Sequence, residues 1–238
     1  MISFHSAGVS FPDPGGTGPD SVLLEPASLD LTEPRIAVIG ANGSGKSTFL
    51  RLINGLARPT TGRIAVQGLD TVRDVAAVRR RVGFLFSDPL SQLVMPLVRE
   101  DVELSLKASV KNKARRREAA LHHLGTMGLA HLSERSVHDL SGGERQLVAL
   151  TSVLATGQGI LVADEPTTLL DLRNNVLLQD TLFGLDQQVI YATHDLDFAA
   201  RADRTLVIDA GRIIHDGDPR DAVDCYRRLA LDPQRGRR

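Results

Sequence analysis

The sequence is short of several features that mark particular classes of protein. It has one cysteine in 238 residues, Cys225, which excludes a disulfide framework within the chain and favours a reducing compartment. No apolar run approaches the roughly 20 residues that span a bilayer, and residues 1–5 lack the charged and apolar stretches of a signal peptide. Lys and Arg, 28 in all, nearly balance 29 Asp and Glu, so bulk charge gives no reason to expect nucleic acid as a partner. If the protein works at a membrane, we expect it to act there as a cytosolic partner of something else.

A glycine-rich loop follows the apolar run 36–39 and leads into a second apolar segment at 49–53. This order of strand, loop and helix is the context in which the pattern G-x-x-x-x-G-K-[ST] binds phosphate. Backbone N–H groups of such a loop wrap a polyphosphate, and the positive end of the following helix faces the same anion. We therefore predict a nucleoside triphosphate site in which Lys46 reaches the β- and γ-phosphates and Ser47 ligates Mg²⁺. Its residues are Gly40, Ala41, Asn42, Gly43, Ser44, Gly45, Lys46, Ser47 and Thr48.

Two neighbouring carboxylates end another apolar strand, residues 160–163. An acid at the carboxyl end of such a strand can hold Mg²⁺ through water, and Asp164 stands at that position. Glu165 points elsewhere and is placed to polarise an attacking water as a general base. The pair predicts hydrolysis of the bound nucleotide.

Apolar strands alternate with helical patterns along most of the chain, which predicts an α/β fold with a mostly parallel sheet covered on both faces. We expect one domain over residues 1–238. About 1–95 and 141–218 form the α/β core, with an N-terminal antiparallel hairpin at 2–11 and 22–31. About 96–140 form an inserted helical subdomain, and 219–238 a C-terminal helix with a disordered basic tail. The basic run 111–117 is either a solvated helix face or a contact for anionic lipid headgroups. Strands are expected at 36–39, 63–67, 82–86, 160–163, 189–192 and 205–208.

The segment Leu140-Ser141-Gly142-Gly143-Glu144-Arg145-Gln146 resembles the signature of the ATP-binding-cassette ATPases, whose other motifs occur here in the family's order. Ser141 is expected to cap the following helix, with the amides of Gly142 and Gly143 forming a second phosphate cradle. The resemblance covers residues 2–218. It implies a P-loop fold in which ATP lies between two head-to-tail cassettes, either two copies of this chain or this chain and a close paralogue. It also implies that His194 contacts the γ-phosphate and that Asp171 belongs to the loop that contacts the other cassette.

Two positions depart from the family pattern. The family places a glutamine directly after the strand at 82–86, where it senses Mg²⁺ and links hydrolysis to the membrane subunit; this chain has Ser87 there, with Gln92 further along. Which of the two residues takes that role stays open. The family's hairpin also offers an aromatic side chain to adenine, and Phe11 is the aromatic nearest the expected position. Stacking on adenine and packing in the core are both open for Phe11.

Residues 92–102 resemble the corresponding stretch in ATPases of energy-coupling-factor importers, which take up vitamins and transition-metal ions. The chain most resembles the biotin type, while cobalt, nickel, another vitamin or a conventional transporter stays open. The resemblance implies a transmembrane coupling protein and a substrate-binding membrane subunit as partners, and a peripheral location on the cytoplasmic face of the cell membrane. We expect Leu93, Val94, Met95 and Leu97 to form an exposed apolar docking surface.

Overall fold

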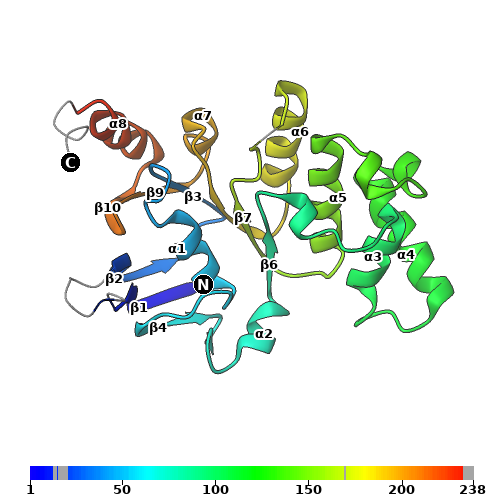
Figure 1. Cartoon of the computed structure of the whole chain (residues 1–238), viewed down its shortest axis with the longest axis horizontal. Helices are drawn as coiled ribbons and strands as arrows, with labels where there is room; N and C mark the ends of the chain where they lie inside the picture. The colour runs from blue at the N-terminus through cyan, green and yellow to red at the C-terminus, as the bar shows by residue number, and fades with distance from the viewer. Residues whose placement is uncertain (13–14, 16–20, 169, 233–238) are drawn as a thin grey trace.

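The computed structural model describes residues 1–12, 15, 21–168 and 170–232. Most of the predicted N-terminal turn and of the basic tail lies outside these residues. Two sheets organise the fold, and Figure 1 shows them on the same side of a separate group of helices. The larger sheet has the strand order β10-β9-β3-β8-β7-β6, in which all neighbours are parallel except β10 and β9. Its strands are β3 (Arg35–Ile39), β6 (Val82–Leu85), β7 (Ile160–Asp164), β8 (Gln188–Ala192), β9 (Arg204–Asp209) and β10 (Arg212–Gly217).

The central strands of the larger sheet are buried on both faces, as their continuous apolar runs predict. Alternate residues of β3 divide between two cores: Ala37 and Ile39 belong to one, Ile36 and Val38 to the other. The first core lies under helices α3 to α8, and the second lies between the larger sheet and the antiparallel sheet. The expected α/β P-loop architecture is confirmed.

The antiparallel sheet has the order β2-β1-β4-β5 and covers helix α1 (Lys46–Ile53). The hairpin pairs β1 (Ile2–Phe11) with β2 (Ser21–Leu31), as expected, and β4 (Thr61–Val66) and β5 (Leu69–Asp70) extend it. Phe4 of β1 stacks on Phe49 of α1 with ring centroids 4.7 Å apart, and both rings are fully or almost fully buried. The sheet therefore clamps the helix that begins at the glycine-rich loop. Helix α2 (Val75–Arg79) follows β5.

The inserted segment folds as helices that stand apart from the sheets in Figure 1. Helices α3 (Val98–Leu106) and α4 (Lys113–Thr126) pack on α5 (Gly142–Leu154), and short 3₁₀ turns occupy 89–91, 130–132 and 137–139. The two ends of the insertion are joined, because Val98 N donates to Arg135 O and Val137 N donates to Pro96 O. Arg99, almost buried, bridges Glu103 and Glu134. The basic run 111–117 forms the turn before α4 and its first residues.

Three helices complete the face of the sheet that carries α5: α6 (Leu172–Phe183), α7 (Leu196–Ala199) and α8 (Pro219–Ala230). Among the described residues, no helix combines the length and the apolar character that crossing a bilayer requires.

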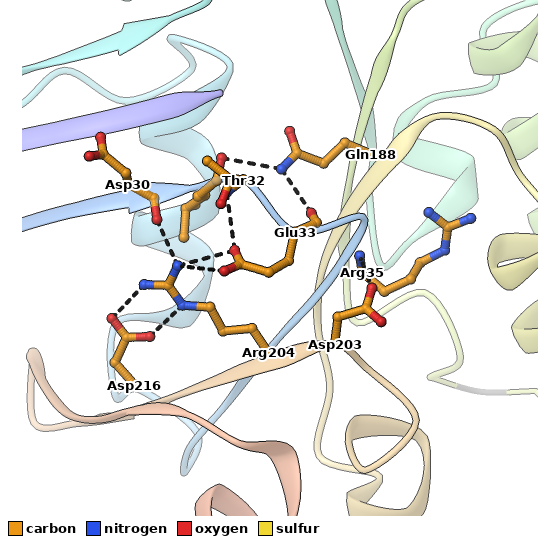
Figure 2. Close-up of polar contacts among 9 residues, drawn as sticks. Asp30, Thr32, Glu33, Arg35, Gln188, Asp203, Arg204 and Asp216 are labelled. Atoms are coloured by element: carbon orange, nitrogen blue, oxygen red, sulfur yellow. Dashed lines mark hydrogen bonds and ion pairs between the residues drawn. The ribbon is translucent and has the colours of Figure 1, made fainter.

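A polar network holds the amino edge of the larger sheet, where β3, β8 and β9 begin (Figure 2). Arg204 donates to both carboxylate oxygens of Asp216, at 2.5 and 2.7 Å, and lies 3.1 Å from Glu33 Oε2. Arg35 donates to the backbone carbonyls of Phe183, Leu185 and Gln187 at and after the end of α6, so the strand and helix that flank the site share one anchor. These contacts lie at the edge opposite to the ends of β3 and β7, from which the candidate site projects.

Candidate ATPase site

The glycine-rich loop leaves β3 and enters α1 through backbone conformations that only glycine adopts easily. Gly45, the N-cap residue of α1, has a φ of 109°. A Cβ atom at this position would lie 2.6 Å from the carbonyl oxygen of Leu23, and one at Gly40 would lie 2.1 Å from that of Ile208. Any side chain at either position would therefore collide with backbone. The first N–H groups of any helix lack intrahelical acceptors, so those of α1 are free of intrahelical bonds next to this loop, as an anion site requires.

A cavity of about 250 Å³ lies against the loop. It is lined by polar groups of the predicted phosphate site together with one apolar side chain, Leu23 of β2. Leu23 was not singled out in the sequence, although the hairpin register that pairs Val9 with Leu24 brings this part of β2 to the loop. The full lining is Leu23, Asn42, Gly43, Gly45, Lys46, Ser47, Thr48 and Glu165.

Lys46 places its ammonium group in this cavity with little exposure to solvent. Its Nζ donates to the carbonyl oxygens of Gly40 (2.9 Å) and Ala41 (3.1 Å) and lies 3.3 Å from Glu165 Oε1. The lysine is 5% exposed. A buried cation with backbone partners and one carboxylate is positioned to bind a phosphate group.

Ser47 and Asp164 meet as the sequence predicts: Ser47 Oγ donates to Asp164 Oδ1 at 2.9 Å. Burial raises the pKa of the Asp164 carboxyl, and the hydroxyl of Ser47 and the charge of Arg51 lower it by less. Arg51 was missed in the sequence, although it stands one helical turn after Ser47 and reaches within 3.8 Å of Asp164 Oδ2. A hydroxyl and a carboxylate are the oxygen donors that Mg²⁺ prefers, so the residues present fit that ion.

Glu165 adopts a strained backbone and is surrounded by partners for its carboxylate. Its φ is 47°, in the left-handed region where a residue with a long side chain is rare. His194 Nδ1 lies 3.0 Å from Glu165 Oε2, and Thr168 Oγ1 donates to the same oxygen at 3.2 Å. Burial raises the pKa of this carboxyl, but the contacts with His194 and Lys46 outweigh it, and the pKa ends below its ordinary value. The carboxylate is thus ionised at neutral pH, as a general base must be.

The signature segment forms the cap of α5, as expected. Ser141 Oγ accepts from the N–H of Glu144 (3.3 Å), and the Glu144 carboxylate accepts from the N–H of Ser141 (2.8 Å), a reciprocal capping box. Gly143 faces the side chain of Asn174 on α6, and Asp171 caps that helix through the N–H of Asn174. Ser141, Gly142 and Gly143 are absent from the lining of the cavity around Lys46. Within one chain, the signature therefore lies apart from the cavity around Lys46.

The structure gives the surroundings of the residues whose roles the sequence left open, Phe11 and the pair Ser87 and Gln92. Phe11 is 54% exposed at the end of β1, so the interpretation that it packs in the core is wrong. Ser87 is exposed, whereas Gln92 is half-buried and its Oε1 accepts from the N–H of Phe86 at 3.2 Å.

The expected apolar docking surface is corrected at one residue. Leu93 is 6% exposed and belongs to the core that includes α5, because the 3₁₀ turn at 89–91 directs it inward. Val94 is 68% exposed, and Met95 and Leu97 are half-buried.

The geometry defines an ATP-hydrolysing cassette, and comparison with known proteins agrees. The ABC transporter family profile matches residues 24–168. The chain belongs to this family and is an ATPase. It is 46% identical, over 96% of its length and 99% of the relative's, to the biotin transport ATP-binding protein BioM of Rhizobium etli. It is 36% identical to the energy-coupling factor transporter ATP-binding protein EcfA1 of Symbiobacterium thermophilum, over 91% of this chain and 79% of that one.

Solved structures resemble the chain over nearly its whole length. The cbiO1 protein of Clostridium perfringens, described as part of the ABC transporter complex cbiONQ, superposes with a TM-score of 0.79 at 27% identity, covering 99% of this chain and 96% of that one. The ATP-binding cassette MJ0796, solved as a dimer bound to ADP and Pi, superposes with a TM-score of 0.80 at 26% identity, covering 92% and 99%. The resemblance to energy-coupling-factor ATPases inferred from the sequence is confirmed.

Proposed function

We propose that this chain is the ATP-hydrolysing subunit of an energy-coupling-factor importer whose substrate is biotin. The observation that supports the substrate is the 46% identity to a biotin transport ATP-binding protein, which extends over essentially the full length of both chains. The ATPase site itself carries no information on the transported molecule, because ATP chemistry is the same for every substrate. Cobalt, nickel or another vitamin is the alternative cargo.

The chemistry of the proposed reaction follows from the groups around Lys46. Lys46 and the N–H groups at the start of α1 bind the terminal phosphates. Ser47 and Asp164 would hold Mg²⁺, which when bound neutralises charge on the phosphate oxygens. Glu165 accepts a proton from the attacking water, and His194 holds Glu165 Oε2 and contacts the γ-phosphate. Leu23 and the exposed ring of Phe11 offer apolar surface to adenine.

A complete site is proposed to need two cassettes. Ser141, Gly142 and Gly143 present helix-terminal N–H groups that lie outside the Lys46 cavity of their own chain. A second cassette placed head to tail would bring its signature to that cavity. Asp171 lies near the signature of its own chain, because it caps α6 through the N–H of Asn174, whose side chain faces Gly143. Two copies of this chain and a pair with a close paralogue both satisfy this geometry.

A groove between the sheet and the inserted helices is the feature that favours docking of a membrane protein. It measures about 290 Å³ and is lined by residues that follow α1, by β6, and by Gln92, Asp101 of α3 and Ser152 of α5. Leu56, which lines it, is 42% exposed, and the neighbouring segment exposes Leu90 (43%) and Val94 (68%). We propose that a cytoplasmic helix of the transmembrane coupling protein docks here, with the substrate-binding subunit attached through that protein. This places the cassette on the cytoplasmic face of the membrane.

Uptake by cells of the native host tests the substrate. A strain that carries Lys46→Ala should lose uptake of radiolabelled biotin to the level of a deletion strain, because the phosphates lose the cation that Lys46 provides. Uptake of Co²⁺ and Ni²⁺, measured in the same strains, is the control. Loss of metal uptake with biotin uptake intact would replace biotin by the metal, and loss of neither would refute an importer of this type for these substrates.

A further inference from the structure

Basic residues gather in two short segments on opposite sides of the groove beside β6. Residues 75–87 carry three Arg, residues 104–117 carry six Lys and Arg, and neither segment contains an acidic residue. Nine of the 28 basic residues therefore lie in these two segments, although the net charge of the whole chain is -1. A chain that is neutral overall but concentrates positive charge locally offers a surface to a polyanion.

The rim of the groove on the side of the sheet consists of Arg79, Arg80 and Arg81, at and after the end of α2. Arg79 lines the groove, and all three side chains are exposed. Arg79 Nη2 donates to Gly55 O at 3.0 Å, and Arg81 Nη1 donates to Gln67 O at 3.3 Å. These carbonyl groups hold the two side chains in place without neutralising their charge. We call this surface the sheet rim.

The opposite rim consists of Lys107, Lys111, Lys113 and Arg115, between α3 and the first turn of α4. Ser105 of α3 lines the groove two residues before Lys107, and Lys111 Nζ donates to Lys107 O at 3.5 Å. All four side chains of this helical rim are exposed. In the described part of the chain, no side chain of either rim forms an ion pair. The charges of both rims are therefore available to a partner.

An open hollow of about 940 Å³ lies beside the helical rim. Lys111, Arg115 and His122 line it, together with the apolar side chain of Val110. Glu118 also lines it, so the two cations exceed one carboxylate. Lys and Arg form charge-assisted hydrogen bonds with phosphate oxygens, and a hollow of this size has room for a phosphodiester group.

We infer that the two rims bind the anionic phospholipid headgroups that surround a membrane protein docked in the groove. The rims of a groove that receives a membrane protein face the surface of the membrane. Anionic headgroups attract each exposed Lys or Arg near that surface by roughly a factor of five in binding, or about 1 kcal/mol, without a fixed geometry. The inference deepens the proposed function, on which the orientation of this face toward the membrane rests.

Lipid fits these rims better than nucleic acid does. The rims flank exposed apolar side chains, Leu56 within the groove and Leu90 after β6. Apolar side chains of this kind have no partner along a phosphate backbone, whereas a membrane protein and its lipids supply both apolar surface and anionic headgroups. The sequence left the basic run 111–117 as either a solvated face or a lipid contact, and its place beside the groove favours the lipid contact.

Sedimentation of the full-length chain with lipid vesicles tests the inference without any membrane protein. The wild type should bind vesicles of phosphatidylcholine and phosphatidylglycerol, and should not bind vesicles of phosphatidylcholine alone. Raising the salt from about 0.1 M to about 1 M shortens the Debye length from about 10 Å to about 3 Å, and should abolish binding. A helical-rim variant should bind with a roughly 100-fold lower partition coefficient, since it loses three charges. Its substitutions are Lys111→Gln, Lys113→Gln and Arg115→Gln.

The matched control makes the same change of charge on α8, which Figure 1 shows at the other end of the molecule from α4. It should lower the partition coefficient less than about fivefold. Both variants should keep the ATPase activity of the wild type in the absence of vesicles, because their residues are absent from the lining of the Lys46 cavity. The control substitutions are Arg220→Gln, Arg227→Gln and Arg228→Gln.

A tryptophan reporter locates the bound lipid. The chain contains no tryptophan, so one introduced tryptophan reports on one place. Ala108, beside the helical rim, and Ala230, at the end of α8, are both exposed. Energy transfer to a dansyl-labelled headgroup in anionic vesicles should be strong from Ala108→Trp and weak from Ala230→Trp. Equal transfer from the two positions would place the lipid elsewhere and overturn the inference.

The outcomes for this surface and for the proposed function are distinct. Failure of the wild type to bind anionic vesicles, equal binding to phosphatidylcholine alone, or undiminished binding by the helical-rim variant would each overturn the inference. Tighter binding of duplex RNA than of anionic vesicles at the same salt would assign the rims to nucleic acid and would also overturn it. A chain that supports biotin uptake but binds no anionic vesicle refutes the lipid surface alone. A chain that binds the vesicles as expected but fails the uptake test refutes the proposed importer and retains the lipid surface.

Discussion

Replacing Glu165 by glutamine keeps the size of the side chain and removes the negative charge that faces the Lys46 cavity. A general base contributes roughly 10²- to 10⁴-fold to a hydrolysis rate, which equals about 2.7–5.4 kcal/mol in the barrier. We expect kcat of the assembled ATPase to fall by that factor, because the amide cannot accept the proton of the attacking water. ATP binding should persist, since Lys46 keeps its positions near Gly40 and Ala41.

Glu165→Gln should change the free energy of unfolding much less than it changes the activation free energy of hydrolysis. Glu165→Gln removes an ion pair with Lys46 at 3.3 Å, but the ammonium retains two carbonyl acceptors. We expect a loss of roughly 1–2 kcal/mol in the free energy of unfolding, or about 2–8 °C in Tm for a chain of this size. The strained backbone at Glu165 is unchanged by the substitution, because glutamine has the same branching.

The assay is steady-state phosphate release by the complex, with nucleotide binding and thermal unfolding measured on the same preparations. The matched control is Thr168→Val, which removes a hydrogen bond to Glu165 Oε2 without changing any charge, and which should lower kcat less than about tenfold. With hydrolysis slowed, ATP and Mg²⁺ should also shift Glu165→Gln towards a cassette dimer in light scattering. Wild-type turnover in a folded Glu165→Gln preparation would refute the assignment of the base.

The remaining predictions concern the groove segment and the amino edge of the sheet. Ser87→Ala should keep at least about a third of the ATPase activity in phosphate-release assays, because its hydroxyl is solvated; a loss as complete as that of Lys46→Ala would contradict this. Val94→Asp should uncouple uptake while leaving the Tm within about 2 °C of wild type, whereas Leu93→Asp should lower Tm by about 5 °C or more because its side chain is buried. At Glu33, partial burial raises the pKa, but two backbone amides and Arg204 outweigh it and leave the pKa below its ordinary value. The ionised Glu33 therefore stabilises the fold above pH 4.5, and this stabilisation is lost as the pH falls through the lower folded-state pKa. Glu33→Gln should reduce the loss of unfolding free energy on acidification, measured by urea unfolding, by up to about 1 kcal/mol.

Local chemistry explains why so much of the phosphate site could be predicted from the sequence. Each motif of the site acts on residues close to it in the sequence. This holds for the glycines before Lys46, for the capping pair Ser141 and Glu144, and for the two carboxylates at and after the end of β7. The capping box and the contact of Ser47 with Asp164 are present in the structure. The parallel sheet follows in the same way, from short apolar runs separated by helical patterns.

Long-range packing decided the features that the sequence left open or missed. Leu23 and Arg51 reach the site from a hairpin strand and from the second turn of α1, and only the register and the helix position bring them there. Leu93 is buried because a 3₁₀ turn reverses its direction, which apolar character alone does not indicate. The contact of Gln92 Oε1 with the Phe86 N–H likewise forms only when the segment after β6 has folded back on the strand. The sequence by itself determined the chemistry of the ATP site, because those motifs act locally; the tertiary structure alone decided which distant side chains support it, because their contacts form only when the chain has folded.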